Sequence, residues 1–512
     1  MAIRSILFGS PGPPAGLEST AEPEHFRDLN LDQIEQAIVR ANADCPLAPY
    51  FRHPLRDAGL VAFRQQVFRD LEDTGVRAVV ERFTGSMRAM RRRLEILGRM
   101  THPPQRQRWF LDIVLAHTET VTAFAEGLGE AALSSPGLCA VRDDLGEHTR
   151  SAEFRSLCER ARRLRDRLDA VRYDMLLHED TITIAPHDPD GDDYSARVLA
   201  TFARFHQAAA RDYRKDPPAD LGLDKVEASV LDLVARLHPD VFAAVAAFHD
   251  EHRDFVAEDL VRLDRELRFC LGYLDFLAPL RAAGLPTCYP SVSETAKEFA
   301  AREAFDLALA ASLTARGEPT VVNDVHLTGS ERILLVSGPN QGGKTTLART
   351  FGQLHHLAAL GCPVPGREVR VYLPDRILTH YEREENLDTL AGKLEEELRR
   401  MRAILDRATP DSVIILNEIF TSTTLRDARA LSETILGVLS ELDALCLWVS
   451  FIDELSRLGG KTVSMVSTVA GDGAATRTFK LVRAPADGRA YAHAIARKHG
   501  LTYEQLRTRV SR

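Results

Sequence analysis

The sequence predicts a multidomain protein with a helical N-terminal region and a C-terminal α/β domain. Its 512 residues are about three times the length of a ~150-residue domain. From residue 31 to residue 285, apolar residues recur at helical spacing, as in Leu157, Leu164 and Leu168. Near residues 286–290 this pattern gives way to short apolar runs that alternate with amphipathic segments. The change marks the expected border between the two regions.

Three segments follow from these patterns. Residues 1–24 are rich in Gly, Pro and Ser and are expected to form a flexible arm. Residues 25–290 are expected to form the helical region, and residues 291–512 the α/β domain. Within the helical region, the alternating run Thr181–Ile184 precedes a Pro- and Asp-rich turn and predicts one strand inserted between helices.

The α/β assignment depends on three continuous apolar runs, Ile333–Val336, Val413–Leu416 and Leu445–Val449. Runs that are apolar on both faces are typical of strands buried in a parallel sheet. Between the first two lies a predicted helix, which ends at Thr409–Asp411. Its apolar stripe comprises Leu387, Leu390, Leu394, Leu398, Met401 and Leu405. Strands that alternate with helices in this way predict an α/β domain with crossover connections.

Composition excludes several classes of protein. Apolar residues make up 45% and charged residues 27%, an ordinary globular balance that argues against disorder. The sequence shows no uncharged stretch of membrane-spanning length and no secretory pattern at its start, so we expect a cytoplasmic protein without membrane contact. The seven cysteines are scattered and never form a CxxC, which argues against a zinc site or disulfides. Because the net charge is −9, any DNA contact requires a local basic patch.

The strongest motif directly follows the run 333–336 and fits the pattern G-x-x-x-x-G-K-[ST] in full. Glycines allow successive backbone N–H groups to point at phosphate oxygens, and the following helix adds positive charge at its N-terminus. Lys344 would neutralise the β- and γ-phosphates, and the hydroxyl of Thr345 would bind Mg²⁺. The expected nucleotide-binding residues are Gly338, Pro339, Asn340, Gln341, Gly342, Gly343, Lys344, Thr345 and Thr346.

A second motif, Asn417-Glu418, ends the apolar run 413–416. Parallel sheets place their ligands at the carboxyl ends of strands, so both side chains are expected at the site. Glu418 is the expected catalytic residue, because its carboxylate would orient or deprotonate the attacking water. Asn417 and Thr345 are the expected metal-site residues. The alternative is a strand end whose two polar residues cap the next helix.

These residues resemble a known family. Residues 338–346 are similar to the phosphate loop G-P-N-M-G-G-K-S-T of MutS-type DNA mismatch-repair ATPases. Further resemblance lies in Val322–Asp324, Gly361 with Pro365, Asp375–Ile377, and Asn417–Thr424 beside the family's D-E-I-G-R-G-T-S-T. The resemblance covers about residues 320–500. It implies an ABC-type P-loop NTPase domain behind a helical lever and core region, in a short bacterial-type form that lacks the mismatch-reading N-terminal domain. It also implies ATP and Mg²⁺ as cofactors and a homodimer formed through the ATPase domain.

Four departures from the family pattern predict slow hydrolysis. Asn417 replaces the family's metal-site Asp, and Phe451 replaces the histidine of its switch segment. Residues 392–396 read Gly-Lys-Leu-Glu-Glu where the family has G-R-S-T-F, so the serine that reaches the partner's nucleotide is missing. Thr320 occupies the place of an adenine-stacking aromatic residue. The phosphate loop itself is intact, so nucleotide binding is expected regardless.

The helical region offers weaker signals. The triplet Phe124-Ala125-Glu126 matches the family's mismatch wedge, but it lies in a helical pattern and is interpreted as an ordinary helix segment with Phe124 in the core. Two arginine clusters are either solvated helix faces or surfaces for the DNA backbone. They comprise Arg88, Arg91, Arg92, Arg93 and Arg99, and Arg160, Arg162, Arg163, Arg165 and Arg167. His355, His356 and His187 are interpreted as helix-surface and loop residues rather than metal ligands.

The leading hypothesis is therefore a DNA-dependent ATPase of DNA repair or DNA-structure recognition. In this hypothesis, a nucleotide switch moves helical arms around duplex, mismatched or branched DNA. The alternative is a catalytically weak, nucleotide-sensing scaffold that binds protein partners and no DNA. A transporter-type or chromosome-type ABC ATPase is disfavoured, since the sequence lacks an L-S-G-G-Q segment.

Overall fold

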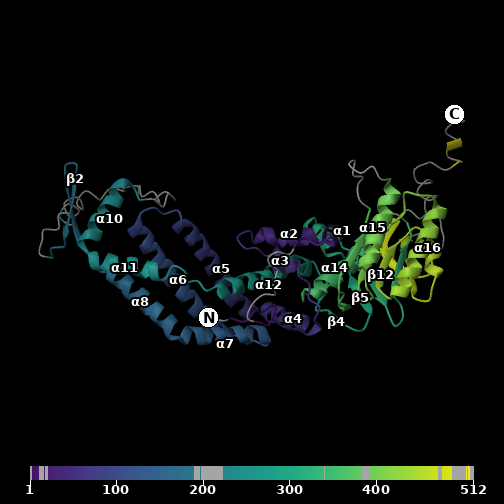
Figure 1. Cartoon of the computed structure of the whole chain (residues 1–512), viewed down its shortest axis with the longest axis horizontal. Helices are drawn as coiled ribbons and strands as arrows, with labels where there is room; N and C mark the ends of the chain where they lie inside the picture. Colours follow the sequence, from purple (N-terminus) through teal and green to yellow (C-terminus); the bar gives the residue numbers. More distant parts are fainter. Residues whose placement is uncertain are drawn as a thin grey trace, which may run out of the picture. The chain divides into compact units, whose positions relative to one another are not determined.

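The computed structural model shows two compact units (Figure 1). The helical unit comprises residues 78–131 and 142–261, and the sheet unit comprises 2–77, 132–141 and 262–512. Within these ranges the structure describes residues 3–10, 17, 21–189, 197, 223–339, 341–382, 392–470, 476–486, 503, 506 and 507.

Side-chain caps set the starts of two helices of the helical unit, α8 (Ala152–Asp169) and α10 (Lys225–Leu237). Ser151 accepts a hydrogen bond from the backbone N–H of Phe154, and Asp224 forms a capping box with Glu227. Phe124 is buried and stacks on Phe83 with ring centroids 4.1 Å apart, which confirms its predicted core position. The helices are α5 (Thr74–Leu97), α6 (Pro103–Glu130), α7 (Pro136–Arg150), α8 (Ala152–Asp169), α10 (Lys225–Leu237), α11 (Pro239–Glu251) and α12 (Glu258–Ala282), of which α5, α7 and α12 run on into the sheet unit.

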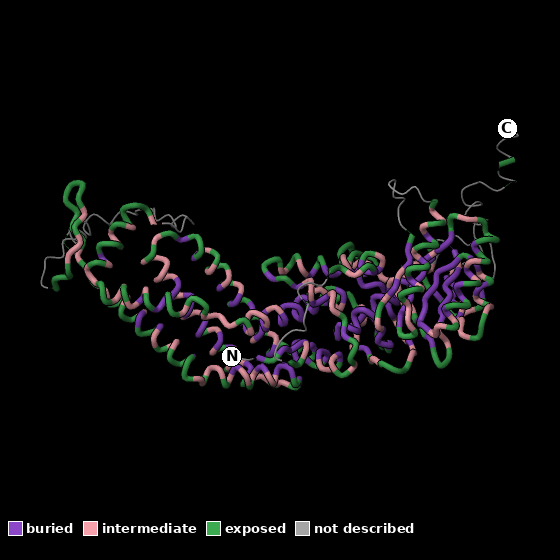
Figure 2. The backbone as a smooth tube through the Cα atoms, in the orientation of Figure 1, coloured by how far each residue is buried: buried purple, intermediate pink, exposed green. Residues whose placement is uncertain are grey.

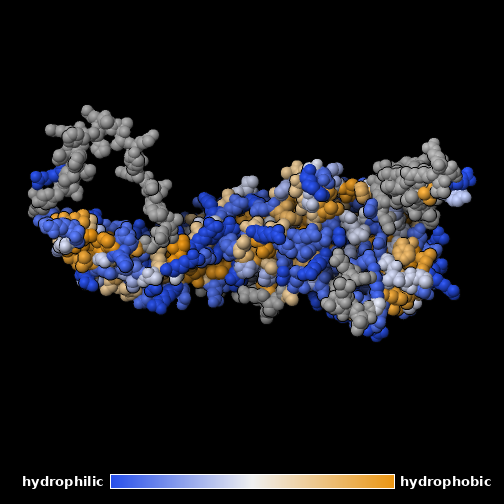
Figure 3. All heavy atoms as spheres, turned by 90° about the horizontal axis from the view of Figure 1, so that it is seen from above, coloured by the Kyte–Doolittle hydropathy of each residue, from blue (hydrophilic) through white to orange (hydrophobic). Residues whose placement is uncertain are grey.

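A β-hairpin interrupts these helices where one strand was expected. Strand β1 (Tyr173–His178) pairs antiparallel with β2 (Thr181–Pro186), so the all-helical prediction for this region is wrong here. The missed strand, β1, has no clean alternation of polar and apolar residues. Its exposed large side chains are Tyr173, Met175, Leu176 and Leu177. Figure 3 shows hydrophobic side chains gathered where Figure 1 places β2 and α10.

The sheet unit is centred on a six-stranded, mostly parallel sheet in the order β10-β11-β12-β7-β13-β14. The three predicted runs form the neighbouring strands β11, β12 and β7, which confirms the α/β prediction. Only β14 runs antiparallel to its neighbour. Figure 2 shows the three central strands β7, β11 and β12 as buried. The strands are β7 (Ile333–Ser337), β10 (Ile377–His380), β11 (Val413–Asn417), β12 (Leu445–Val449), β13 (Thr462–Ala470) and β14 (Thr476–Arg483).

Three helices connect the strands of this sheet: α14 (Lys344–Ala359), α15 (Lys393–Arg407) and α16 (Leu425–Leu442). Helix α14 is buried over most of its length and contacts β11 and β12. In α15, Met401 is buried as predicted, but Leu398 is 37% exposed, so the predicted apolar stripe is wrong at that position. The first two residues of the stripe, Leu387 and Leu390, lie outside the described residues.

Shorter elements complete the sheet unit. A four-stranded sheet has the order β4-β9-β5-β6, and β3 pairs with β8. Among the described residues, none of the helices is long and apolar enough to cross a membrane. The remaining elements are α1 (His25–Asp28), α2 (Leu31–Ala41), α3 (Ala48–Phe51), α4 (Ala58–Glu72), α13 (Leu307–Ala315), β3 (Thr287–Cys288), β4 (Ser291–Ser293), β5 (Phe299–Ala304), β6 (Asn323–Leu327), β8 (Val364–Pro365), β9 (Glu368–Tyr372) and the 3₁₀ helix η2 (Asp453–Arg457).

Residues 3–10, expected to belong to a flexible arm, are instead packed into the sheet unit. Ser5 Oγ donates to Glu266 Oε1 at 2.7 Å, and the backbone N–H of Ile6 donates to Glu266 Oε2 at 2.9 Å. The guanidinium of Arg64 donates to the carbonyl of Leu7 at 2.6 Å. Glu266 has no exposed surface, and burial raises its pKa to about 7 despite the hydrogen bonds and nearby arginines that lower it.

This carboxyl predicts a pH-dependent stability. Because the pKa of Glu266 is higher in the folded state than in the unfolded chain, the protonated form contributes stability that is complete below pH 4.5 and is lost as pH rises through 7. The loss should be about 3 kcal/mol between pH 5 and pH 8. Urea denaturation of the parent and of Glu266→Gln at several pH values measures it. The parent should lose about that much more free energy of unfolding than the variant, and parallel pH profiles would contradict the assignment.

Candidate nucleotide-binding site

The carboxyl ends of three strands lie level with one another in the central sheet. Asn417 of β11 is in register with Val449 of β12, and Val449 is in register with Val336 of β7. The backbone N–H groups of Glu418 and Ser450 continue this pairing, donating to the carbonyls of Val449 at 2.9 Å and Val336 at 3.0 Å. The segments that follow the three strands therefore meet at one edge of the sheet, where α/β proteins hold ligands.

The segment after β7 is the predicted phosphate loop, and its backbone requires glycine at several positions. Gly338 and Gly343 have φ angles of 118° and 89°, which side chains with a Cβ rarely adopt. Gly343 is the N-cap of α14, so the loop leads directly into the N-terminus of a 16-residue helix. Gln341 also has a positive φ, of 59°. Asn340 lies outside the described residues.

Ser467 of β13 fixes this loop from the neighbouring strand. Its hydroxyl donates to the carbonyl of Gly342 at 2.6 Å, and a Cβ at Gly342 would collide with the same hydroxyl. A Cβ at Gly338 would lie 3.1 Å from both the Cβ and the backbone nitrogen of Ser467. The sequence does not predict this role for Ser467, because nothing in a run of small and apolar residues indicates which of them faces the loop.

Lys344 is the first residue of α14 and is only 4% exposed. Its ammonium donates to the carbonyls of Gly338 at 2.9 Å and Pro339 at 3.2 Å. It also lies 3.4 Å from Oε1 of Glu418. A buried ammonium needs such partners because its desolvation is costly. The structure therefore brings together Lys344 and Glu418, two site residues that are 74 positions apart in the sequence.

Asn417 and Glu418 take different environments at the end of β11. Glu418 has a φ of 51°, uncommon for a residue with a Cβ, and its side chain is 30% exposed. Asn417 is 8% exposed, and within the described part of the chain its Oδ1 has no hydrogen-bond partner. A buried acceptor without a donor is rare in folded proteins. A metal-bound water would supply such a donor, so the chemistry of Asn417 fits a magnesium shell. Thr345, the other expected metal-site residue, is half-buried in the first turn of α14.

The positions that depart from the family pattern lie on different elements. Phe451 follows β12 and is 45% exposed, so it leaves an aromatic ring open to solvent after the strand end. Gly392 is the N-cap of α15 and offers no side-chain cap. Glu397 of α15 accepts a hydrogen bond from Ser422 at 3.2 Å, which connects α15 to the segment after β11. Thr320 is half-buried, and its hydroxyl has no partner among the described residues.

Phe479 of β14 is a further residue that the sequence analysis missed. It has a φ of 55° and is 47% exposed. Its carbonyl lies 3.5 Å from where a Cβ of Gly343 would be, and it accepts a hydrogen bond from Asn323 Nδ2 at 3.2 Å. An exposed aromatic ring therefore lies on the strand that borders the phosphate loop. An isolated Phe in an alternating strand gives no sign of this in the sequence.

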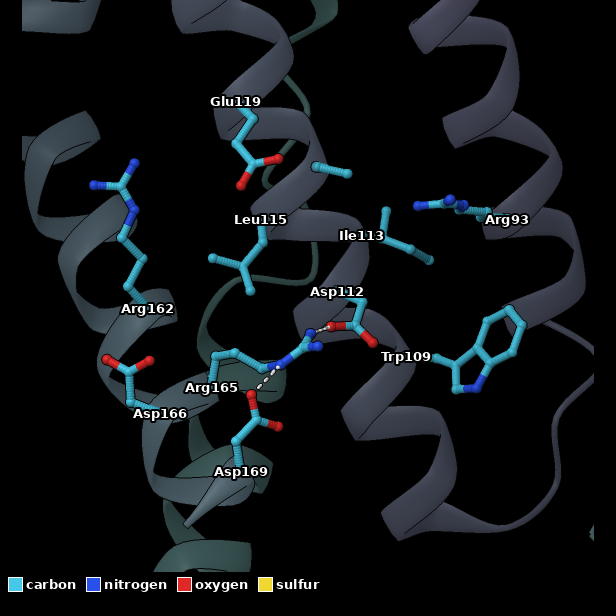
Figure 4. Close-up of a pocket in the computed structure, with 11 residues that line it drawn as sticks. Arg93, Trp109, Asp112, Ile113, Leu115, Glu119, Arg162, Arg165, Asp166 and Asp169 are labelled. Atoms are coloured by element: carbon cyan, nitrogen blue, oxygen red, sulfur yellow. Dashed lines mark hydrogen bonds and ion pairs between the residues drawn. The ribbon is translucent and has the colours of Figure 1, made fainter.

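The second arginine cluster, in the helical unit, is largely paired with carboxylates. Arg160 forms a bidentate ion pair with Glu251, and Arg163 forms an ion pair with Glu159 at 3.0 Å. Arg165 lies between two carboxylates, Asp112 and Asp169, in a cavity of about 700 Å³ (Figure 4). Four carboxylates and three arginines, Arg93 among them, line this cavity together with Trp109. These pairs agree with a solvated helix face for this cluster.

The first arginine cluster differs. Arg92, Arg93 and Arg99 are exposed, and within the described ranges none of the three has an ion-pair partner. Arg88 and Arg91 are half-buried. Among the described residues, the first cluster therefore offers three exposed guanidinium groups without an ion-pair partner, and the second offers two, those of Arg162 and Arg167.

Comparison with known proteins places this site in a family. Residues 334–502 match the family model of MutS domain V. The chain is 35% identical over 193 residues to Endonuclease MutS2 of Thermus thermophilus, a match that covers 36% of this chain and 25% of that protein. It is 32% identical over 194 residues to DNA mismatch repair protein MutS of Shouchella clausii, covering 37% of this chain and 22% of that protein. The matched stretch thus spans about a quarter of the length of these relatives. Residues 334–502 contain the phosphate loop, β11 and β12, and this part of the chain is therefore similar to domain V of MutS proteins.

Proposed function

We propose that this chain is an ATP-binding, MutS-like protein of DNA repair that hydrolyses ATP slowly. In this proposal it forms a homodimer through its ATPase domain, and ATP binding changes its affinity for duplex, mismatched or branched DNA. The observation that carries the proposal is a complete phosphate-loop sequence at the junction of β7 and α14, with the buried Lys344 beside Glu418. The comparisons add that relatives with this domain are named as mismatch-repair proteins.

The phosphates would be held by the backbone N–H groups of residues 338–346 and by Lys344. The positive φ angles of Gly338 and Gly343 curl the loop, and α14 contributes the partial positive charge of its N-terminus. Ser467 holds the carbonyl of Gly342 and so keeps the loop in this shape. Phe479 offers an exposed ring beside Gly343 on which a base can stack.

The hydrolytic step would depend on Glu418, with Asn417 and Thr345 in the magnesium shell. Mg²⁺ neutralises charge on the transferred phosphoryl group. An amide at position 417 can accept from a metal-bound water but lacks the negative charge of a carboxylate. Glu418 must also exchange its contact with Lys344 for one with the attacking water. Both features support slow turnover and a long-lived ATP state.

Replacing Lys344 with alanine should abolish ATP binding, since its ammonium lies within the phosphate loop, against the carbonyls of Gly338 and Pro339. Calorimetry with the purified chain and millimolar ATP·Mg²⁺ measures the binding. The parent should release heat with one site per chain, and Lys344→Ala should bind at least 100-fold more weakly. Lys461→Ala is the control and should bind like the parent, because it removes an ion pair with Asp443 beside the start of β13, outside the phosphate loop. Equal heats for the parent and Lys344→Ala would refute the proposal.

Replacing Asn417 with aspartate should restore the missing charge beside the magnesium site. We expect a several-fold faster ATPase rate and saturation at a lower Mg²⁺ concentration. In the same steady-state assay, Glu418→Gln should lose at least 100-fold of the rate, because a positioned general base contributes about 10²–10⁴-fold. If Asn417→Asp leaves both the ATPase rate and its Mg²⁺ dependence unchanged, the amide of Asn417 is not the cause of slow hydrolysis.

DNA contact should involve the first arginine cluster rather than the second. Each lost phosphate contact reduces the slope of log K against log salt by about 1. Changing Arg92, Arg93 and Arg99 together to glutamine should therefore lower the slope by up to about 3. Gel-shift titration of homoduplex, mismatched and branched DNA, with and without ATP, gives the slopes. Arg160→Gln is the control, because Arg160 is already paired with Glu251. Slopes that fall equally in both variants would contradict this assignment.

One observation favours the alternative of a scaffold that binds protein partners. Tyr173, Met175 and Leu177 are exposed on one face of β1, where their cross-strand partners are also mostly apolar. Apolar side chains suit a protein surface better than a phosphate backbone. In that case the chain would bind no DNA at any salt concentration, and Glu418→Gln would not change the basal ATPase rate.

A further inference from the structure

The sheet unit has a cavity at the opposite end of α14 from the phosphate loop, called the second cavity here to separate it from the one beside Arg165. It has a volume of about 370 Å³, within the range of small-molecule sites. The last two turns of α14 contribute His355, His356 and Ala359. The other walls come from the start of α1, the segment 52–56, the turn before β10 and the end of α15. Segments distant in the sequence therefore enclose one small space.

The lining of this cavity is positively charged. It holds four guanidinium groups and two carboxylates, which gives a net formal charge of +2 with neutral histidines. The arginines are Arg52, Arg56, Arg376 and Arg407, and the carboxylates are Glu24 and Asp375. Such a surface repels metal cations and attracts anions.

The four arginines differ in how firmly they are held. Arg52 is fixed by two hydrogen bonds to the buried Glu35, at 2.5 and 2.9 Å. The other arginines are exposed, and Arg407 and Arg376 pair with the lining carboxylates. Exposed pairs contribute little, so these two guanidinium groups can turn to a ligand at small cost. Arg56 has no ion-pair or hydrogen-bond partner in the described part of the chain.

The histidines of the cavity are buried, and the expectation that His355 and His356 lie on a helix surface is wrong. His356 Nε2 lies 2.8 Å from the carbonyl of Phe51, so this nitrogen donates. Its Nδ1 then accepts from His25 Nε2 at 3.3 Å. Burial lowers the pKa of His355 and His356 to about 4, so both are neutral at pH 7. The sequence did not predict this because adjacent histidines on a helix give no burial signal.

His355 leaves a hydrogen-bond acceptor without a donor. Its Nδ1 lies 2.8 Å from the carbonyl of Phe351 and must carry the proton. Its Nε2 therefore has a free lone pair, and within the described residues this buried atom has no partner. His355 has no exposed surface, so this lone pair is not open to the cavity, and the guanidinium groups are what the cavity offers to an anion.

We propose that this cavity binds a small organic phosphate, with its phosphate on Arg56, Arg376 and Arg407 and its organic part in the rest of the cavity. Guanidinium groups match phosphate oxygens in pairs, which favours this ligand over a simple carboxylate. The cavity shares no lining residue with residues 338–346, so the site does not depend on ATP binding.

Calorimetry on the full chain tests the proposal with ribose 5-phosphate as the probe. Lys344→Ala serves as the parent for these titrations, so that the phosphate loop does not contribute. Ribose 5-phosphate should bind once per chain, more tightly than inorganic phosphate, and ribose alone should give no heat. Adding Arg56→Ala and Arg376→Ala should weaken binding at least tenfold. Arg402→Ala is the matched control, because it removes an exposed arginine of α15 that lies outside the cavity.

Two results would overturn the proposal. One is the absence of any binding heat with ribose 5-phosphate. The other is an affinity that the Arg56→Ala and Arg376→Ala changes leave intact. Both arginines are exposed, so the variants should keep the far-ultraviolet circular dichroism and melting temperature of the parent, which excludes unfolding as the cause of a loss.

Discussion

The candidate site depends on one buried charge, the ammonium of Lys344. A cation that is 4% exposed must be surrounded by acceptors, and the carbonyls of Gly338 and Pro339 and the carboxylate of Glu418 fill that role. This requirement explains the curled loop, because only a tight turn brings two carbonyls back onto the side chain six residues later. It also explains why the ends of β7 and β11 must lie close together. A triphosphate offers stronger acceptors than these groups, so the same charge that shapes the loop can bind nucleotide.

The order of strands in the central sheet brings the other residues of the candidate site close to Lys344. With β12 between β11 and β7, Asn417, Val449 and Val336 end at one level. With β13 on the other side of β7, Ser467 reaches the loop. The second cavity lies at the far end of α14, so one helix borders two candidate anion sites that are built from different groups: backbone amides in one and guanidinium groups in the other. Because the two share no residue, we expect substitutions in one to leave the other unchanged.

The local sequence pattern predicts the buried strands of the central sheet. It does not predict features whose position depends on contacts between residues that are distant in the sequence. The runs at 333–336, 413–416 and 445–449 are apolar on both faces, which only a buried strand explains, and they form β7, β11 and β12. Asn417 and Glu418 were predictable because they end such a run. Ser467 and Phe479 were not, since their roles depend on which strand lies beside β7. Residues 3–10 were expected to be loose, because their composition does not reveal that Glu266 and Arg64, more than 50 positions away, hold them.

Hydrogen–deuterium exchange of the backbone amides in residues 338–346 tests the central claim most directly. If these N–H groups surround the phosphates of ATP·Mg²⁺, their exchange should slow at least tenfold when nucleotide is added, while the amides of β1 and β2 should not change. Lys344→Ala should show no such protection. Exchange in the loop that is the same with and without ATP·Mg²⁺ would contradict the account.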